Sequence, residues 1–266
     1  MASPSPIRLG VAGALGRMGR AVIRLADASD QVEVAALVDR PDAADQDVGG
    51  RALVTPEQAL ARCQVMVDFS SAGASAALAR LAAGRGGVAL VIGSTGFSPQ
   101  EEAQVREAAG RIAIVKSGNF SLGINLLLGL VEQAARALPA ADYDIEVFEA
   151  HHRRKVDAPS GTALMLGEAA ARGRGVELGQ VSERGRDGMT GPRGPGAIGF
   201  SVMRGGGIVG EHEVVLAAED EIIRLQHSAR DRSLFARGAL RAAQWVAGRP
   251  AGLYDMQDVL GLRATG

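Results

Sequence analysis

Short apolar runs alternate with segments of helical periodicity along the first half of the chain. The runs are rich in Val, Ile and Leu and lie at residues 7–12, 32–38, 65–69, 88–92 and 112–115. Between them, apolar residues recur with helical spacing over 18–28, 75–83 and 99–110. Strands that are apolar on both faces and are separated by helices are typical of a parallel sheet covered on both sides. The pattern predicts an α/β, Rossmann-type doubly wound domain over residues 1–122.

The pattern changes after Asn119. Residues 122–138 and 162–172 have helical periodicity, and 143–150 has the pattern of a strand. From Val181 the chain is rich in glycine and carries strand-like runs at 197–203, 212–217 and 221–228. Because no helical segment separates these runs, we expect antiparallel pairing, and so a smaller α+β domain with a mixed or antiparallel sheet over 123–232.

Two segments of the second half are harder to place. The last helical segment, 233–247, fits either domain, and we expect residues 233–266 to rejoin the first. The Gly-, Pro- and Arg-rich stretch 188–196 is flanked closely by structured segments. It is therefore expected to be a mobile loop rather than a linker between domains.

Composition narrows the classes of function. The chain has 266 residues, a formal net charge of -1 and 3% aromatic residues, so neither a positive field nor stacking platforms favour nucleic acid. No stretch offers the ~20 consecutive apolar residues of a membrane span, and residues 1–6 lack the features of a signal peptide. Cys63 is the only cysteine, which excludes an internal disulfide and fits a reducing compartment. We expect a cytoplasmic protein that binds neither nucleic acid nor a membrane.

A glycine-rich turn joins the first predicted strand to the first predicted helix. Its residues run Gly13-Ala14-Leu15-Gly16-Arg17-Met18-Gly19. A dinucleotide-binding fold needs small residues here, because backbone must approach the pyrophosphate and the helix N-terminus must offer it free N–H groups. The same glycines would also suit a turn that merely eases packing, but the order of strand, turn, helix and second strand favours the cofactor.

An acidic residue and a basic residue follow the second predicted strand. Asp39 stands where a carboxylate accepts hydrogen bonds from the adenosine ribose, and Arg40 could bind the 2′-phosphate of NADP, with Arg17 as a second candidate. The pair indicates NADPH or NADH as cofactor. The alternative is a solvated charge pair at a strand end.

The segment from Glu149 to Thr162 carries most of the candidate chemistry. His151 and His152 end an apolar strand, so at least one of them is held on rigid backbone as a possible proton donor. Ser160 is placed as the N-cap of the next helix, whose unpaired N–H groups could hold a carboxylate. Cations beside a helix start suggest a site for a small polyanion. A solvated basic loop is the plainer alternative, and a metal site is disfavoured because the spacing has no HxxxH pattern.

The same segment resembles a known family. Glu149 to Thr162 is similar to the EAHHxxKxDAPSGTA signature of the dihydrodipicolinate reductases. Further similar stretches occur in the same order, namely GALGRMGR, DFS, GSTGF, SGNFSLGIN, GAIGFSVMRGGGIVGEHEV and YDMQDVLGL. The resemblance implies NAD(P)H-dependent reduction of 4-hydroxy-tetrahydrodipicolinate to tetrahydrodipicolinate, in the diaminopimelate route to lysine. It also implies a homotetramer.

The resemblance assigns roles residue by residue. His151 would be the catalytic proton donor and Lys155 its charged partner. The small dicarboxylate substrate would contact His152, Ser160, Gly161 and Thr162. The cofactor would contact Gly13, Ala14, Leu15, Gly16, Arg17, Met18, Asp39, Arg40, Gly93, Ser94, Thr95, Ser117, Gly118, Asn119 and Phe120. No metal is implied.

Two other functions stay open at this point. One is a dehydrogenase of another small acid, which would use the same cofactor turn. The other is a non-catalytic dinucleotide sensor or a basic-loop binding module. A sensor needs the glycine turn but has no use for clustered His151, His152 and Lys155 beside a helix start, so the sequence favours an enzyme.

Overall fold

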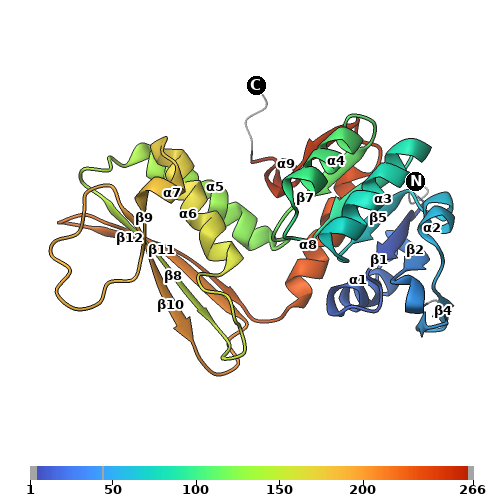
Figure 1. Cartoon of the computed structure of the whole chain (residues 1–266), viewed down its shortest axis with the longest axis horizontal. Helices are drawn as coiled ribbons and strands as arrows, with labels where there is room; N and C mark the ends of the chain where they lie inside the picture. The colour runs from blue at the N-terminus through green and yellow to red at the C-terminus, as the bar shows by residue number, and fades with distance from the viewer. Residues whose placement is uncertain (1–4, 44, 263–266) are drawn as a thin grey trace. The chain divides into compact units, whose positions relative to one another are not determined.

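The computed structural model describes residues 5–43 and 45–262, which form two compact units (Figure 1). The first unit runs to Leu122 and takes up the chain again at Ser233. The second unit is Gly123–Arg232. None of the described helices is long and apolar enough to cross a membrane.

A parallel sheet forms the centre of the first unit. Its strand order is β13-β7-β6-β5-β1-β2, and every neighbouring pair is parallel. The strands are β1 (Ile7–Ala12), β2 (Val32–Val38), β5 (Val65–Asp68), β6 (Ala89–Ile92), β7 (Ala113–Lys116) and β13 (Gly252–Tyr254). The strand order reverses at β1, so the carboxyl ends of β1 and β5 are where a fold of this kind is expected to bind a ligand. The predicted Rossmann-type sheet is confirmed.

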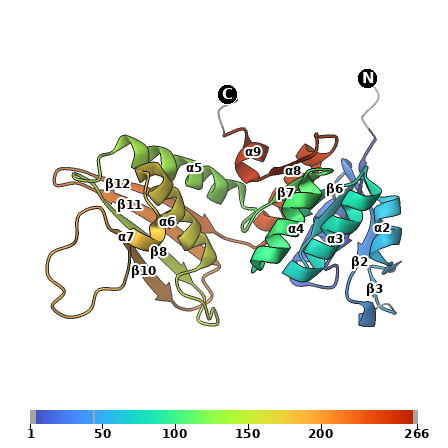
Figure 2. The same cartoon turned by 45° about the horizontal axis from the view of Figure 1, so that its top comes forward.

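Helices cover both faces of this sheet. One face carries α1 (Arg17–Asp27), α8 (Ser233–Val246) and α9 (Met256–Leu260), and the other carries α2 (Pro56–Arg62), α3 (Ala72–Arg85) and α4 (Pro99–Ala109). Figure 2 shows α3 and α4 side by side. Neighbouring residues of a strand pack on opposite faces of the sheet. Val91 lies in the core with α1, α8 and α9, and Leu90 lies in the core with α2, α3 and α4. The uninterrupted apolar runs in the sequence follow from this double burial.

Several short elements of the first unit have no counterpart in the sequence prediction. They are η1 (Pro41–Ala43), β3 (Asp47–Val48), β4 (Arg51–Ala52), α2, β13 and α9. Helix α2 had a readable signal, because Thr55 caps it, Pro56 is its first residue and Gln58 closes a capping box. The same signal at Ser98, Pro99 and Glu101 begins α4.

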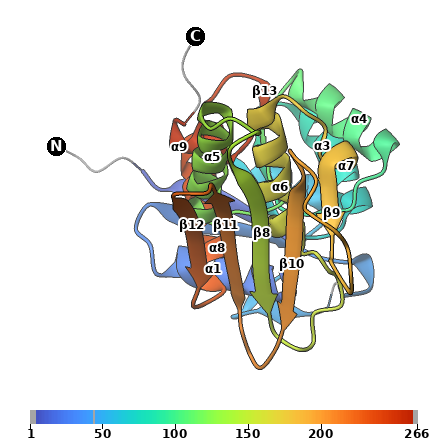
Figure 3. The same cartoon turned by 90° about the vertical axis from the view of Figure 1, so that its left-hand side faces the viewer.

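The second unit contains a mixed five-stranded sheet with the order β12-β11-β8-β10-β9. Its strands are β8 (Asp144–His151), β9 (Ser182–Arg184), β10 (Ile198–Arg204), β11 (Gly210–Ala217) and β12 (Ile222–Ala229), and Figure 3 looks onto this sheet. Strand β11 is antiparallel to β8 and β12, whereas β10 is parallel to β8 and β9. The prediction of a mixed or antiparallel sheet is confirmed, but the expectation of antiparallel pairing is wrong for β10. The chain crosses through α6 (Gly161–Arg174) and α7 (Leu178–Val181) between β8 and β10, and such a crossover returns a strand in parallel.

Helices cover one face of the second sheet. Helix α5 (Leu122–Ala137) and α6 bury Leu128 and Leu166 against Val147 of β8. On the opposite face of the described strands, Phe148 is half-buried and Met203 and Ile222 are 48% and 58% exposed. The loop over 188–196 is tied to the sheet at one point, because Arg193 donates to the carbonyl oxygens of Ile145 and Ala197 at 2.8 Å and 2.6 Å. Its predicted mobility stays a prediction.

Candidate active site

A buried carboxylate and a histidine lie together at the end of β8. Glu149 and His151 are two residues apart on this strand, so both side chains lie on the same face of the sheet. Glu149 is fully buried, and its Oε2 lies 2.6 Å from Nδ1 of His151, whose side chain is 12% exposed. A rigid strand thus holds the histidine, as its sequence position predicts.

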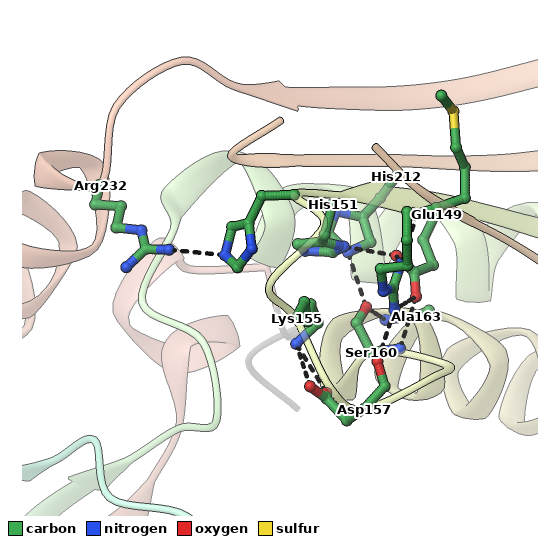
Figure 4. A network of polar contacts seen from close by, with 11 residues as sticks. Glu149, His151, Lys155, Asp157, Ser160, Ala163, His212 and Arg232 are labelled. Atoms are coloured by element: carbon green, nitrogen blue, oxygen red, sulfur yellow. Dashed lines mark hydrogen bonds and ion pairs between the residues drawn. The ribbon is translucent and has the colours of Figure 1, made fainter. Parts of the chain in front are cut away.

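Arg204 joins this pair from the neighbouring strand β10. Its guanidinium donates to both oxygens of Glu149, at 2.7 Å to Oε1 and 2.8 Å to Oε2. The backbone N–H of Ser160 donates to Oε1 at 2.9 Å (Figure 4). Burial alone would raise the pKa of the Glu149 carboxyl, but hydrogen bonds from Arg204, His151 and Ser160 outweigh it and hold the pKa below its ordinary value. Glu149 is therefore ionised at neutral pH.

A second histidine comes from β11. The ring of His212 stands edge-on to that of His151, with 5.1 Å between the ring centroids, and its Nε2 lies 3.2 Å from Oγ of Ser160. Burial, together with the nearby His151, lowers the pKa of His212 to about 4. His212 is a neutral side chain beside His151 at physiological pH.

Helix α6 begins next to these side chains. Ser160 is its N-cap and accepts a hydrogen bond from Ala163 N at 3.2 Å, as the sequence predicts. Gly161 is its first residue, and a Cβ placed there would meet nothing within 4 Å. The first turn carries no acidic residue, so the start of the helix suits an anion. Thr162 lies in the same turn.

The loop between β8 and α6 holds the remaining cations. Nζ of Lys155 lies 2.8 Å from each carboxylate oxygen of Asp157, and Arg153 and Arg154 are exposed. Nη2 of Arg232 lies 3.2 Å from Nε2 of His152. The described hydrogen bonds thus place Lys155 on Asp157 rather than on His151. Across residues 5–43 and 45–262, His, Cys, Asp and Glu form no group of three or more that could hold a metal ion.

The glycine turn of the first unit leads from β1 into α1. Gly13 has a φ of +73°, and a Cβ there would lie 2.8 Å from the carbonyl oxygen of Phe69. A Cβ on Gly19 would lie 2.1 Å from the carbonyl oxygen of Gly13, so Gly19 allows α1 to pack closely on the turn. Gly16 is the N-cap of α1 and has no capping side chain. The N–H groups that follow, over Arg17 and Met18, therefore have no capping side chain to accept from them.

The charged residues after β2 have partners within the chain. Oδ2 of Asp39 accepts from Leu15 N at 2.8 Å, and Oδ1 accepts from Arg40 N at 2.8 Å. Nε of Arg40 lies 3.3 Å from Oδ1 of Asp42, and both side chains are largely exposed. Asp39 thus lies against the glycine turn.

The other predicted cofactor residues follow β6 and β7 at the same edge of the sheet. Gly93, Ser94 and Thr95 come after β6, and Ser117, Gly118, Asn119 and Phe120 come after β7. Oγ of Ser94 lies 2.6 Å from Oγ of Ser75. Oγ of Ser117 donates to the carbonyl oxygen of Asn119 at 2.7 Å. The parallel strands bring all of the predicted cofactor residues to one edge.

Family models match both units. The model described as dihydrodipicolinate reductase, N-terminus, matches residues 7–120, and the model described as dihydrodipicolinate reductase, C-terminus, matches 123–260. The chain belongs to the dihydrodipicolinate reductase family. The 4-hydroxy-tetrahydrodipicolinate reductase of Caulobacter vibrioides is 60% identical to this chain. The match covers 97% of this chain and 98% of the relative. The enzyme of the same name from Rhizobium rhizogenes is 52% identical over 98% of both chains. The family makes this chain an NAD(P)H-dependent oxidoreductase.

Solved structures share the fold of the reductase. A dipicolinate-bound dihydrodipicolinate reductase from Paenisporosarcina sp. TG-14 has a TM-score of 0.79 at 22% identity, covering 95% of this chain and 98% of its own. A diaminopimelate dehydrogenase of C. glutamicum has a TM-score of 0.57 at 13% identity, covering 99% and 97%. At these identities the likeness concerns the fold alone.

Sequence reasoning did not single out three residues of the site. Glu149 could have been found by its register, because it follows Ile145 and Val147 at the alternating apolar positions of β8, and a carboxylate on a buried face needs a partner. His212 interrupts the alternation of β11 in the same way, at a buried position of the strand. Arg204 carried no signal, since only the parallel pairing of β10 with β8 brings it to Glu149.

Proposed function

We propose that this chain reduces 4-hydroxy-tetrahydrodipicolinate to tetrahydrodipicolinate with NADPH or NADH, in the diaminopimelate route to lysine. The observation that carries the proposal is the juxtaposition of Glu149, His151 and the anion-accepting start of α6 in a member of this family. A proton donor and a carboxylate site are what reduction of a dicarboxylate ring requires.

His151 is the residue that would donate a proton to the substrate. Loss of water from the substrate would give a conjugated ring imine, to which a bound NADPH or NADH would supply the hydride. The ring must then gain a proton, and His151 is the histidine held rigidly by the strand and only partly buried. His212 does not suit this role, because its low pKa keeps it unprotonated. His151 is therefore the catalytic acid of the proposal.

The substrate's two carboxylates need cations and N–H donors. The start of α6 at Ser160, Gly161 and Thr162 would hold one of them, with His152 as a further contact. Lys155 would hold the other. Because Lys155 lies on Asp157 in this structure, substrate binding would exchange one carboxylate partner for another. This exchange leaves no cation unpaired in either state.

The residues at the carboxyl edge of the first sheet fit a dinucleotide. Backbone N–H groups at the uncapped start of α1 would hold the pyrophosphate, along the turn from Gly13 to Met18. The oxygens of Asp39 can accept hydroxyl groups in addition to Leu15 N, since each carboxylate oxygen has two lone pairs. Arg40 would meet a 2′-phosphate. The segments 93–95 and 117–120 would also contact the cofactor.

The assembly and the compartment complete the proposal. Phe148, Met203 and Ile222 leave apolar surface on the helix-free face of the second sheet, and copies of the chain would bury it in a homotetramer. Analytical ultracentrifugation would test this state. The free, buried Cys63 suits a reducing compartment, and we place the enzyme in the cytoplasm.

One assay tests the reaction. Oxidation of NADPH and of NADH is followed by absorbance with freshly prepared 4-hydroxy-tetrahydrodipicolinate and, separately, with a panel of small keto and hydroxy acids. We expect rapid oxidation with the dipicolinate-pathway substrate and only background with the panel. Turnover of a panel member in preference to that substrate would assign the chain to a different reductase activity.

A further inference from the structure

The carboxylate of Glu149 is surrounded by donors on both of its oxygens. Oε1 accepts from Arg204 and from Ser160 N, and Oε2 accepts from Arg204 and lies 2.6 Å from Nδ1 of His151. Each oxygen thus has two close partners, and the side chain is fully buried. Its position leaves little freedom to rotate away from the histidine.

The charge of Glu149 decides the tautomer of its neighbour. An ionised carboxylate can only accept hydrogen bonds, so Nδ1 of His151 must be the donor. The bidentate guanidinium of Arg204 keeps the carboxylate ionised in a buried place. When one ring nitrogen holds its proton against a carboxylate, the other is the nitrogen that gains and loses protons.

Gly210 marks where that other nitrogen lies. A Cβ built on Gly210 would come within 3.2 Å of Nε2 of His151 and 3.7 Å of Cε1 of His212. Gly210 begins β11 and is itself buried. Its missing side chain therefore leaves space beside Nε2 that any other residue would fill.

We propose that Glu149, clamped by Arg204, is the positioning residue that fixes the tautomer of His151 and presents its Nε2 toward the space beside Gly210, from which the proton is delivered. This inference deepens the proposed function, and its last step, delivery of the proton to substrate, rests on that function. The tautomer itself is a property of the protein without substrate and can be measured separately.

The spectroscopic test uses the ring nitrogens of the histidines. Long-range ¹H–¹⁵N correlation spectra of the full chain, with His151 assigned by loss of its signals in H151Q, distinguish the two neutral tautomers. In the unmodified protein we expect neutral His151 to carry its proton on Nδ1. A ring with its proton on Nε2 overturns the proposal before any variant is made.

Glu149→Gln should reverse this preference. The amide oxygen will take the Oε1 position, because Ser160 N and Nη2 of Arg204 can only donate there, whereas His151 at the Oε2 position can become an acceptor. The amide NH₂ will then face Nδ1 of His151, and Nη1 of Arg204 will turn away from it. A donor at that position requires a lone pair on Nδ1, so the proton moves to Nε2. Glu146→Gln is the matched control, because Glu146 lies on the same strand and pairs with Arg193 rather than with His151. An unchanged tautomer in E149Q contradicts the proposal.

Kinetics separate positioning from mere structure. E149Q should lower kcat by roughly 10²-fold with substrate KM within a few-fold, and should cost nothing further in an H151Q background, because Glu149 acts through His151. Gly210→Ala should also lower kcat while leaving the tautomer unchanged, and Gly207→Ala, whose Cβ would meet nothing within 4 Å, is its control.

The outcomes distinguish this inference from the proposed function. If H151Q keeps wild-type kcat, the assignment of the acid fails, whereas the spectra still decide the tautomer. If H151Q is slow but E149Q and G210A turn over normally, the acid stands and the positioning role is overturned. An additive loss in the double variant also overturns it, since it would show that Glu149 acts independently of His151.

Discussion

The two candidate sites, one in each unit, are built on opposite principles. At the glycine turn of the first unit, Gly13 and Gly19 hold backbone close to backbone, and a ligand would be bound by N–H groups that no side chain covers. At the end of β8 in the second unit, Glu149, His151 and Arg204 form a network of side chains from two strands. Substitutions should therefore damage the first by adding atoms and the second by removing polar ones.

The largest effect should come from removing the acid. His151→Gln should lower kcat by roughly 10²–10⁴-fold with little change in substrate KM, because a proton donor acts in the transition state. Steady-state kinetics measure this, with circular dichroism to confirm folding. A His151 variant with wild-type kcat would reduce the segment to a solvated basic loop.

Adding atoms at the glycine turn should affect binding of the cofactor instead. Gly16→Val should raise the KM of NADPH and NADH on the order of 10²-fold, because its side chain occupies the approach to the pyrophosphate. Gly19→Ala is the contrasting change, since its Cβ would lie 2.1 Å from a backbone oxygen and must destabilise the fold. Unchanged cofactor binding in folded G16V would refute the assignment of the turn.

Lys155 should behave differently from His151. If Lys155 pairs with a substrate carboxylate, Lys155→Ala should raise KM and lower kcat, with a loss of about 1.5–3 kcal/mol in kcat/KM. Asp157→Asn offers a matched test, because it frees Lys155 from its partner and should lower substrate KM by a few-fold. A K155A variant with wild-type KM would exclude the carboxylate contact.

Acid should destabilise the second unit through His212. Its pKa falls from 6.5 to about 4 on folding, so the unfolded chain binds more protons between these values. The stabilising contribution is fully present above pH 6.5 and is lost as pH falls toward 4. Thermal melts across this window should show a melting temperature that falls as pH is lowered in the unmodified protein. In His212→Asn the melting temperature should depend less on pH. Parallel curves for the two proteins would show that His212 is not the group responsible.

The smallest effect should concern the choice of cofactor. Arg40 is exposed and lies against Asp42, so Arg40→Ala should weaken NADPH by a few-fold and leave NADH nearly unchanged. Asp42→Asn should act in the opposite direction, because it releases the guanidinium for the 2′-phosphate. Equal effects on both cofactors would show that Arg40 does not contact that phosphate.

The same contrast explains what the sequence could predict. The parallel sheet, the glycine turn and the capped start of α6 depend on local patterns, and the sequence places them within a few residues of where they lie. Two ion pairs could not be predicted, namely Lys155 with Asp157 and Arg40 with Asp42. Each cation has several charged groups within reach, and the sequence does not show which of them it contacts. The clamp of Arg204 on Glu149 joins strands 55 positions apart and needs the parallel register of β10. Such a contact leaves no local periodicity to read.

One pair of measurements tests most directly whether the glycine turn binds the cofactor and His151 donates the proton. NADPH is titrated into H151Q and into G16V, and turnover of 4-hydroxy-tetrahydrodipicolinate is measured on the same preparations. We predict that H151Q binds NADPH like the unmodified protein but turns over substrate roughly 10²–10⁴-fold more slowly. G16V should bind NADPH weakly and recover much of its turnover when the cofactor is raised. Loss of NADPH binding in folded H151Q, or normal turnover by that variant with saturating cofactor, would contradict the account.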